Sequence, residues 1–391
     1  MVTVSALPRL LVLAAALLAS HSRPGLAQSE DDSAEDLSPR EQAYINLSSR
    51  NYQELERALK VHLDAYAARK IPEAELASKF SVFYRSYGLE SRFDEWVSAF
   101  PRSYSARLAR GIYLISDAWR RRGNRYADQT TDNQFQELID TMKRAASDLQ
   151  ASLGMYERPV ESYRYLIMVS MALGLPSTRG LLDAALKLDP EAYFPRSDYL
   201  EAITPKWGGS TSQMDAFLEE CKRSPMSDAD KTRLEARYHL SLGGHEYMAK
   251  RYLAASGHYE KAYQLGKNPN DLYWSAKSMV DGGYKGQALT TFTELVNAHP
   301  QYQRGYTGRG YLYEKEFKND EKAFKDYLAA AELGNSWAQN RVGWWYMTGK
   351  YVAQDYAKAR DYLNRAASQN NKTAIANLKN LDKIQKSGAA R

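Results

Sequence analysis

The stretch KAFKDYL at residues 322–328 recurs as KARDYL at residues 358–363, and this repetition decides the fold. The Lys-Ala pair returns after 36 residues, and the small pair Ala330-Ala331 returns at the same spacing as Ala366-Ala367. A fixed period of this length is typical of stacked helical hairpins. A single hairpin cannot bury both of its faces, so each unit is stabilised by its neighbours.

The pattern extends backwards from this repeat. Gly308 and Gly343 lie 35 residues apart, and we take them, with Ala276, as equivalent positions where small residues let two helices approach closely. Val and Ile are scarce, alternation of apolar and polar residues is not sustained, and Ala, Leu, Lys, Glu and Tyr recur at helical spacing. The sequence therefore predicts an all-α solenoid of helical hairpins without a substantial sheet.

Charge and cysteine content exclude several classes of protein. The 391 residues include 53 Lys and Arg against 47 Asp and Glu, and the surplus is thinly spread. No basic stripe of the kind that binds nucleic acid is present, so we expect no nucleic-acid partner. Cys221 is the single cysteine, which excludes an intramolecular disulfide, and we interpret it as a small buried apolar residue.

The first 27 residues have the layout of a secretory signal peptide. The apolar run LLVLAAALLA at residues 10–19 is too short to span a bilayer, and Gly25-Leu26-Ala27 places small residues before a cleavage site after Ala27. Residues 28–40 are predicted to be a disordered acidic leader. No later stretch reaches the apolar length of a membrane span, so we expect a periplasmic or secreted protein with no span after cleavage.

Two repeat families resemble the last part of the chain. Residues 337–378 resemble a Sel1-like repeat, and residues 269–302 look like a tetratricopeptide repeat. The Sel1-like pattern departs at Val342, usually Leu, and at Tyr351, often Gly. The resemblance implies repeats over residues 236–385. The matching residues are Ala338, Val342-Gly343, Tyr346, Gly349, Val352, Asp355, Lys358-Ala359 and Ala366-Ala367 in the first, and Ala276, Gly283, Ala288, Phe292 and Pro300 in the second.

The preceding region, predicted as a helical domain over residues 41–235, is similar to the bacterial family called domain of unknown function 4034. That resemblance spans about residues 50–220 and implies an exported bacterial protein without implying an activity. It departs at Lys206, where the family usually has Arg. It rests on Trp96-Val97, Pro101, Ser103, Ala106, Gly111, Ala118–Gly123, Ala145, Asp148-Leu149, Ala184–Pro190, Tyr199-Leu200, Pro205–Ser210, Met214 and Phe217.

The segments that suggest catalysis or metal binding lack residues or geometry that those functions require. His245-Glu246 would begin a zinc-protease motif, but Ala249 stands where the second His is required. Adjacent acidic pairs such as Glu219-Glu220 diverge by about 100° around a helix and cannot face one bond together. We therefore predict no catalytic residues, no metal ligands and no cofactor, and a protein that is not an enzyme.

Aromatic and basic residues of the repeats supply the candidate binding site. Counting from the equivalent small positions, we expect five side chains to face the concave groove and to bind a protein or peptide partner in the cell envelope. These are Tyr273, Lys277, Arg309, Tyr313 and Trp344.

An alternative places an enzyme or small-molecule site in the central domain. The loop from Trp207 through Gly208, Gly209 and Ser210 has two glycines that permit close backbone approach, and Trp207 either lines a pocket or plugs the adjacent helices. Arg120 belongs to a basic cluster that fits an anionic ligand or complements a helix C-terminus before Gly123.

Overall fold

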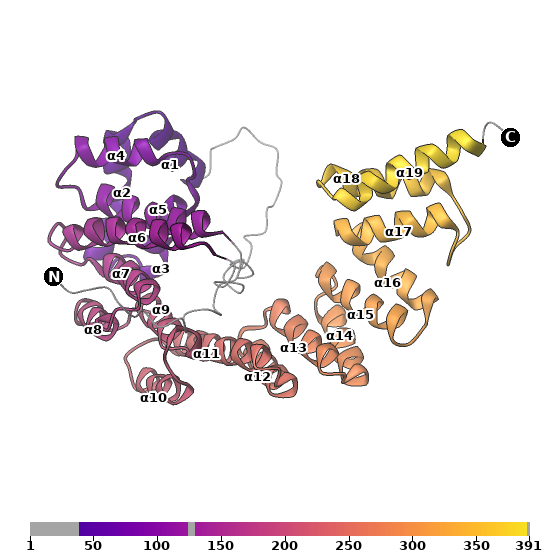
Figure 1. Ribbon diagram of the computed structural model, residues 1–391. Coiled ribbons are helices and arrows are strands. Elements are labelled where there is room, and N and C mark those ends of the chain that lie inside the picture. Colours follow the sequence, from indigo (N-terminus) through magenta and orange to yellow (C-terminus); the bar gives the residue numbers. More distant parts are fainter. Residues whose placement is uncertain (1–38, 124–129, 389–391) are drawn as a thin grey trace. The chain divides into compact units, whose positions relative to one another are not determined.

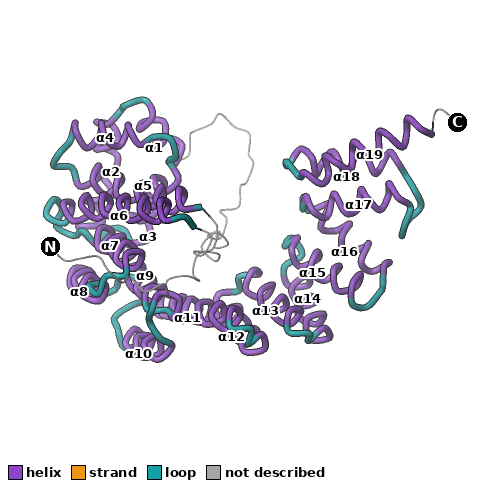
Figure 2. The backbone as a smooth tube through the Cα atoms, viewed as in Figure 1, coloured by secondary structure: helices purple, strands orange, loops and turns teal. Residues whose placement is uncertain are grey.

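The computed structural model describes residues 39–123 and 130–388, and all regular structure within these ranges is helical (Figures 1 and 2). This confirms the all-α prediction. The predicted signal peptide and most of the acidic leader lie outside the described residues. The first helix, α1, begins at Pro39, so the last two residues assigned to the leader are helical.

The chain divides into two compact units, the first ending at Ser241 and the second beginning at Leu242. The division falls inside helix α11 (Asp228–Met248). The first unit contains α1 (Pro39–Ser48), α2 (Tyr52–Ala67), α3 (Glu73–Phe80), η1 (Ser81–Arg85), α4 (Glu90–Ala99), α5 (Tyr104–Arg122), α6 (Asp132–Ser152), α7 (Val160–Leu173), α8 (Thr178–Leu188), α9 (Phe194–Ala202), η3 (Pro205–Trp207) and α10 (Thr211–Lys222).

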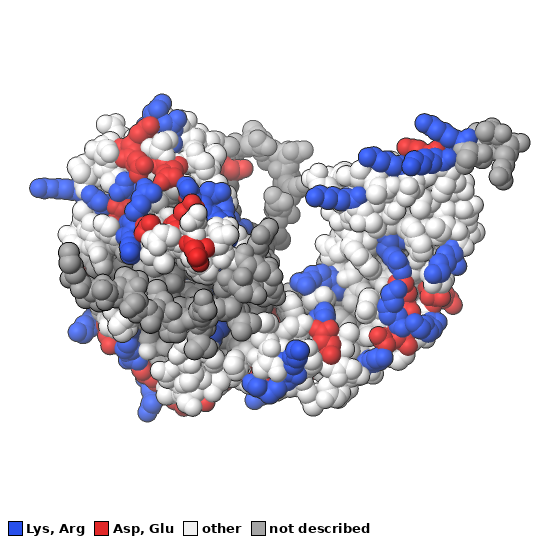
Figure 3. Space-filling view, viewed as in Figure 1, with Lys and Arg blue, Asp and Glu red and all other residues white. Residues whose placement is uncertain are grey.

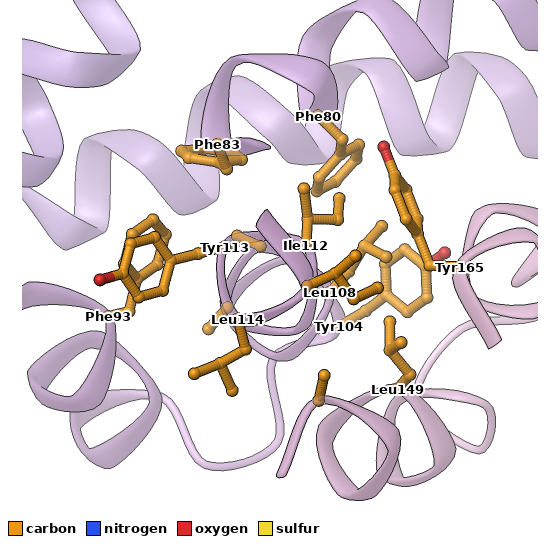
Figure 4. Packing of buried hydrophobic residues seen from close by; sticks show 14 of the residues in the cluster. Phe80, Phe83, Phe93, Tyr104, Leu108, Ile112, Tyr113, Leu114, Leu149 and Tyr165 are labelled. Carbon is orange, nitrogen blue, oxygen red and sulfur yellow. The ribbon is translucent and has the colours of Figure 1, made fainter. Parts of the chain in front are cut away.

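Helix α5 forms the centre of the first unit. Most of its residues are buried, and Figure 4 shows Phe83 and Phe93 from neighbouring helices around it. The rings of Phe93 and Tyr113 stack with centroids 4.7 Å apart. The helix ends at Arg122 because Gly123 adopts a φ of 77°, and three arginines occupy its last turn. The reading of residues 120–123 as a helix C-terminus is thus confirmed.

Buried polar side chains fix the start of α9 in the first unit. The carboxylate oxygen Oε2 of Glu73 accepts hydrogen bonds from the backbone N–H groups of Tyr193 at 2.7 Å and Phe194 at 3.1 Å. The guanidinium of Arg164 lies 4.3 Å from the ring centroid of Phe194 and donates to Asp198 at 2.9 Å. A residue of α3 therefore supplies the cap that α9 lacks locally.

The second unit is a series of helical hairpins that pack on one another in chain order. Hairpins of this kind bury their apolar faces between neighbours. The hairpins are formed, in order, by the C-terminal end of α11 with α12 (Tyr252–Gly266), α13 (Pro269–Asp281) with α14 (Lys285–Ala298), α15 (Gln303–Lys315) with α16 (Asp320–Glu332), and α17 (Ser336–Thr348) with α18 (Tyr356–Ser368), followed by α19 (Lys372–Gly388).

Glycines show where helices of one hairpin approach closely. A Cβ added at Gly343 would lie 2.8 Å from Cγ of Leu363 in the partner helix, and one added at Gly310 would lie 2.8 Å from the ring of Tyr327. Gly308 instead faces Phe292 of the preceding hairpin, at 2.3 Å. The equivalence of Gly308 with Gly343 was therefore wrong, because Gly310 occupies that position.

Cys221 is 2% exposed and lies on α10, as the prediction of a buried apolar role requires. Burial raises the pKa of its thiol to about 12. None of the helices in residues 39–123 and 130–388 is long and apolar enough to cross a membrane. On the face shown in Figure 3, basic side chains are interspersed with acidic ones.

Candidate functional site

The second unit contains a cavity of about 390 Å³, lined chiefly by the first helices of three successive hairpins. Sites for ligands commonly have a volume of this order. Helices α13, α15 and α17 supply most of the wall. The lining residues are Tyr273, Lys277, Val280, Asp281, Phe292, Arg304, Thr307, Gly308, Tyr311, Asn335 and Trp337.

The missing side chain of Gly308 creates the apolar floor of this cavity. Phe292 is 1% exposed and its ring fills the space beside Gly308, where any Cβ would collide with it. Val280 of α13 adds a second apolar surface. The floor is therefore built from aliphatic and aromatic groups that cannot hydrogen-bond, and it favours an apolar ligand group.

Arg304 is the residue that gives the cavity a cation without a carboxylate partner in the part of the chain that the structure describes. Its guanidinium lies 3.9 Å from the ring centroid of Tyr273, and its Nη1 donates to Oδ1 of Asn270 at 3.0 Å. The hydroxyl of Tyr302 donates to the same oxygen at 3.2 Å, which fixes Asn270 in place. No carboxylate within the described ranges forms an ion pair with Arg304. Its charge is thus held in position and remains available to a ligand.

The charges of Lys277 and Asp281, both on α13, neutralise one another. The Lys277 ammonium pairs with the Asp281 carboxylate one helical turn away on α13. Asp281 also accepts a hydrogen bond from the hydroxyl of Tyr247. Because Asp281 is the only acidic residue among those that line the cavity, the net charge of the lining residues is positive and comes from Arg304.

Two aromatic side chains lie exposed at the edge of the cavity. Tyr311 is 43% exposed and Trp337 is 46% exposed, although the Trp337 ring packs edge-on against Tyr327 with centroids 5.2 Å apart. Asn335 caps α17 by accepting a hydrogen bond from the N–H of Ala338 at 2.9 Å. The positive end of the α17 dipole therefore faces the same cavity.

The structure distributes the five predicted groove residues unevenly. Tyr273 and Lys277 line the cavity. Trp344 is partly buried against the core of the last hairpins, with the Arg341 guanidinium 5.2 Å from its ring centroid. Whether these residues bind a partner stays a prediction.

The other two predicted residues pack within their own hairpin. Arg309 donates to the carboxylate of Asp326 at 2.7 and 2.8 Å, and Tyr313 packs against the core formed by α16 and α17. Neither lines the cavity, to which α15 contributes Arg304, Thr307, Gly308 and Tyr311. Counting from Gly310 in place of Gly308 moves the position of Arg309 to Tyr311. Aligning Ala323 and Tyr327 with Ala288 and Phe292 of the preceding second helix gives an offset of 35 residues, which carries Ala276 to Tyr311 and does not by itself select Gly310.

Comparison with known families gives one match, in the first part of the chain. Residues 47–181 match the family model Domain of unknown function (DUF4034). The match lies within the first unit and ends before Pro205–Ser210, which the sequence resemblance had included. No curated protein matches the chain in sequence.

Solved structures similar to the chain are repeat proteins. One is YrrB, a tetratricopeptide repeat protein with an unusual peptide-binding site, at 18% identity over 51% of this chain and 97% of that chain, with a TM-score of 0.32. Another is a Sel1 repeat protein from Oxalobacter formigenes, at 15% identity over 91% of this chain and 98% of that chain, with a TM-score of 0.38.

In the alternative site, Arg120 lies inside the DUF4034 match and the loop of residues 207–210 follows it. Trp207 packs edge-on against Trp119 with centroids 6.2 Å apart. The indole Nε1 of Trp207 is buried without a hydrogen-bond partner. Arg120, inside the match, donates to Asp117 at 2.9 Å and lies 5.4 Å from the ring centroid of Tyr87.

The two glycines of this loop are required by its backbone conformation. Gly208 has a φ of 90°, and a Cβ at Gly209 would lie 2.0 Å from the carbonyl oxygen of Ile203. Ser210 accepts a hydrogen bond from the N–H of Gln213 at 3.2 Å and caps α10. These contacts explain the loop as a tight turn, and a pocket there stays a prediction. The described residues contain no group of three or more His, Cys, Asp or Glu placed to hold a metal ion.

Proposed function

We propose that the protein is an interaction scaffold that binds a peptide segment of another protein in the cavity of its second unit. The observation that carries this proposal is the cavity itself, which crosses α13, α15 and α17 and has the exposed rings of Tyr311 and Trp337 at its edge. Exposed aromatic side chains beside a pocket are the usual anchors of protein interfaces.

A binding role fits the cavity better than a catalytic role. Its single carboxylate, Asp281, is occupied by Lys277 and Tyr247, so no free acid or base faces Arg304. A segment extended along the stack meets each first helix in turn and can bury apolar side chains beside the aromatic residues. The arrangement of the three first helices therefore favours binding of an extended peptide segment.

We further propose that the scaffold is exported and acts in the cell envelope. The apolar run at residues 10–19 and the small residues before Ala27 support this part of the proposal. Intact-mass measurement of the exported protein should give a chain that begins at Gln28. A mass that retains residues 1–27 would contradict cleavage.

Photo-cross-linking in cells tests the binding role. The photoreactive residue p-benzoylphenylalanine replaces Tyr311 in one variant and Phe317 in a control variant. The two positions are equally exposed, at 43%, and lie on one hairpin, but only Tyr311 lines the cavity. We expect one dominant adduct from position 311 that is absent from position 317. Equal adducts from both positions, or none from 311, would refute binding in this cavity.

A further inference from the structure

We infer that the cavity recognises a segment in which an apolar side chain stands next to an aspartate or glutamate, with the apolar group above Gly308 and the carboxylate on Arg304. This inference rests on the proposed peptide-binding function and assigns the chemistry of the ligand. It follows from the separation of the cavity into an apolar floor and one uncompensated cation.

The apolar half of the site is the floor formed by Gly308, Phe292 and Val280. These residues offer no side-chain hydrogen-bond donor or acceptor, so a polar ligand group placed there would lose its hydration without compensation. An aliphatic or aromatic side chain buries its surface there at no such cost. The absence of a Cβ at position 308 lets the Phe292 ring lie against α15 and line the cavity beside Val280, and the ligand side chain packs on this surface.

The half of the site that binds the carboxylate is the guanidinium of Arg304. A guanidinium has five N–H donors, and within the described ranges this one is engaged by the neutral side chains of Asn270 and Tyr302 and by no carboxylate. Stacking on Tyr273 holds its plane in place, so a carboxylate can accept two parallel hydrogen bonds with little loss of side-chain entropy. The N-terminus of α17 adds partial positive charge at Asn335 and Trp337.

The charge of the lining residues argues against a basic ligand. A lysine or arginine in the cavity would meet Arg304 and would have to displace Lys277 or Tyr247 from Asp281. An acidic ligand group instead forms a new ion pair without breaking one.

The position of Arg304 favours a side-chain carboxylate over a chain terminus. Arg304 lies on α15, the middle one of the three first helices that line the cavity. A bound segment therefore continues beyond Arg304 toward α13 on one side and toward α17 on the other. An internal aspartate or glutamate satisfies this geometry, whereas a terminal carboxylate would leave one side of the cavity empty.

Selection from a displayed library tests the inference. The purified protein selects from random octapeptides that are flanked by linker sequence at both ends. We expect enriched peptides in which Asp or Glu is adjacent to Leu, Ile, Met, Phe or Trp. One enriched peptide is then synthesised together with its Glu→Gln or Asp→Asn analogue, and dissociation constants are measured by fluorescence anisotropy.

The variants Arg304→Gln and Lys261→Gln separate the site from general electrostatics. Lys261 is an exposed residue of α12 that does not line the cavity, so its substitution removes the same charge elsewhere. We expect Arg304→Gln to weaken binding of the acidic peptide at least tenfold, to leave the amide analogue unaffected, and to retain the wild-type melting temperature within a few degrees. Lys261→Gln should bind both peptides as the wild type does.

Each other outcome overturns a stated part of the proposal. Enriched peptides without an acidic residue, an amide analogue that binds equally well, or equal losses in both variants would refute recognition by Arg304 while leaving peptide binding intact. Enrichment only from a library with a free C-terminal carboxylate would refute the side-chain assignment. The absence of any enriched peptide would refute the proposed function together with this inference.

Discussion

Gly343 and Leu363 lie at the closest approach of α17 and α18, where a Cβ on the glycine would come within 2.8 Å of the leucine Cγ. The carbonyl oxygen of Ala359 lies 3.2 Å from the same point, so the leucine side chain cannot simply turn away toward it. This contact limits the separation of the two helices in the last complete hairpin.

Substitution Gly343→Leu should therefore destabilise the second unit by about 1–3 kcal/mol or more, since overpacking in a closed interface costs that amount. Urea unfolding followed by circular dichroism measures the change. Gly286→Leu is the matched control because nothing lies within 4 Å of a Cβ at that exposed helical position. An unchanged midpoint for Gly343→Leu would show that α17 and α18 pack differently.

Tyr311 and Tyr313 lie two residues apart on α15 and should respond in opposite ways to truncation. Tyr311→Ala removes an exposed ring from the cavity edge and should weaken binding of a selected peptide tenfold or more, with little change in melting temperature. Tyr313→Ala removes a ring that packs against the α16–α17 core and should lower stability by about 2–3 kcal/mol. Anisotropy titration measures the binding and thermal unfolding measures the stability of both variants. Loss of stability in Tyr311→Ala with loss of binding alone in Tyr313→Ala would contradict the assignment.

Asp271 should make the stability of the second unit depend on pH. It is 3% exposed on α13, and burial raises the pKa of its carboxyl from 3.8 to about 7. The folded state therefore disfavours ionisation, and stability present below pH 4 is lost as the pH rises toward 7. A shift of this size corresponds to at most about 4 kcal/mol.

Asp271→Asn should remove this dependence, with little effect at pH 4 and a higher urea midpoint than the wild type at pH 8. The measurement is a series of urea unfolding curves between these two values. Parallel curves for wild type and variant across the range would show that the carboxyl ionises freely in the folded protein.

Glu73 should matter through its shape as a hydrogen-bond acceptor more than through its charge. Burial, and then the nearby Glu161, raise the pKa of its carboxyl. Glu73→Gln keeps an acceptor for the N–H groups of Tyr193 and Phe194, so we expect a loss below about 1 kcal/mol at pH 6. Glu73→Ala leaves both buried donors unpaired and should cost about 2–4 kcal/mol. Equal losses for the two variants in urea unfolding at pH 6 would contradict this role.

The hairpin fold could be predicted because its signals are local and periodic. Ala288 and Phe292 of one second helix return 35 residues later as Ala323 and Tyr327 of the next, a spacing that is visible in the sequence itself. The groove was harder to predict, because α15 carries Gly305, Gly308 and Gly310 within six residues. Only packing against Phe292 or Tyr327 distinguishes the last two, and counting from Gly308 selected Arg309 where counting from Gly310 gives Tyr311.

The buried polar contacts of the first unit had no sequence signal. Glu73 and Tyr193 are 120 residues apart, and their hydrogen bond depends on how α3 is placed beside α9. Neither residue belongs to a sequence motif from which this hydrogen bond could be predicted. Arg304 was likewise missed, since its availability follows from the absence of a nearby carboxylate within the described ranges and from its stack on Tyr273.

The burial of Cys221 has a practical consequence for every experiment on this protein. A thiol whose pKa is raised to about 12 and whose side chain is enclosed reacts slowly with maleimides and disulfides at neutral pH. Cysteines introduced at chosen surface positions, such as 311 in the cavity or 317 outside it, can therefore carry fluorophores or spin labels without first removing the native one. Distance measurements between such labels can then be made on an otherwise unaltered chain.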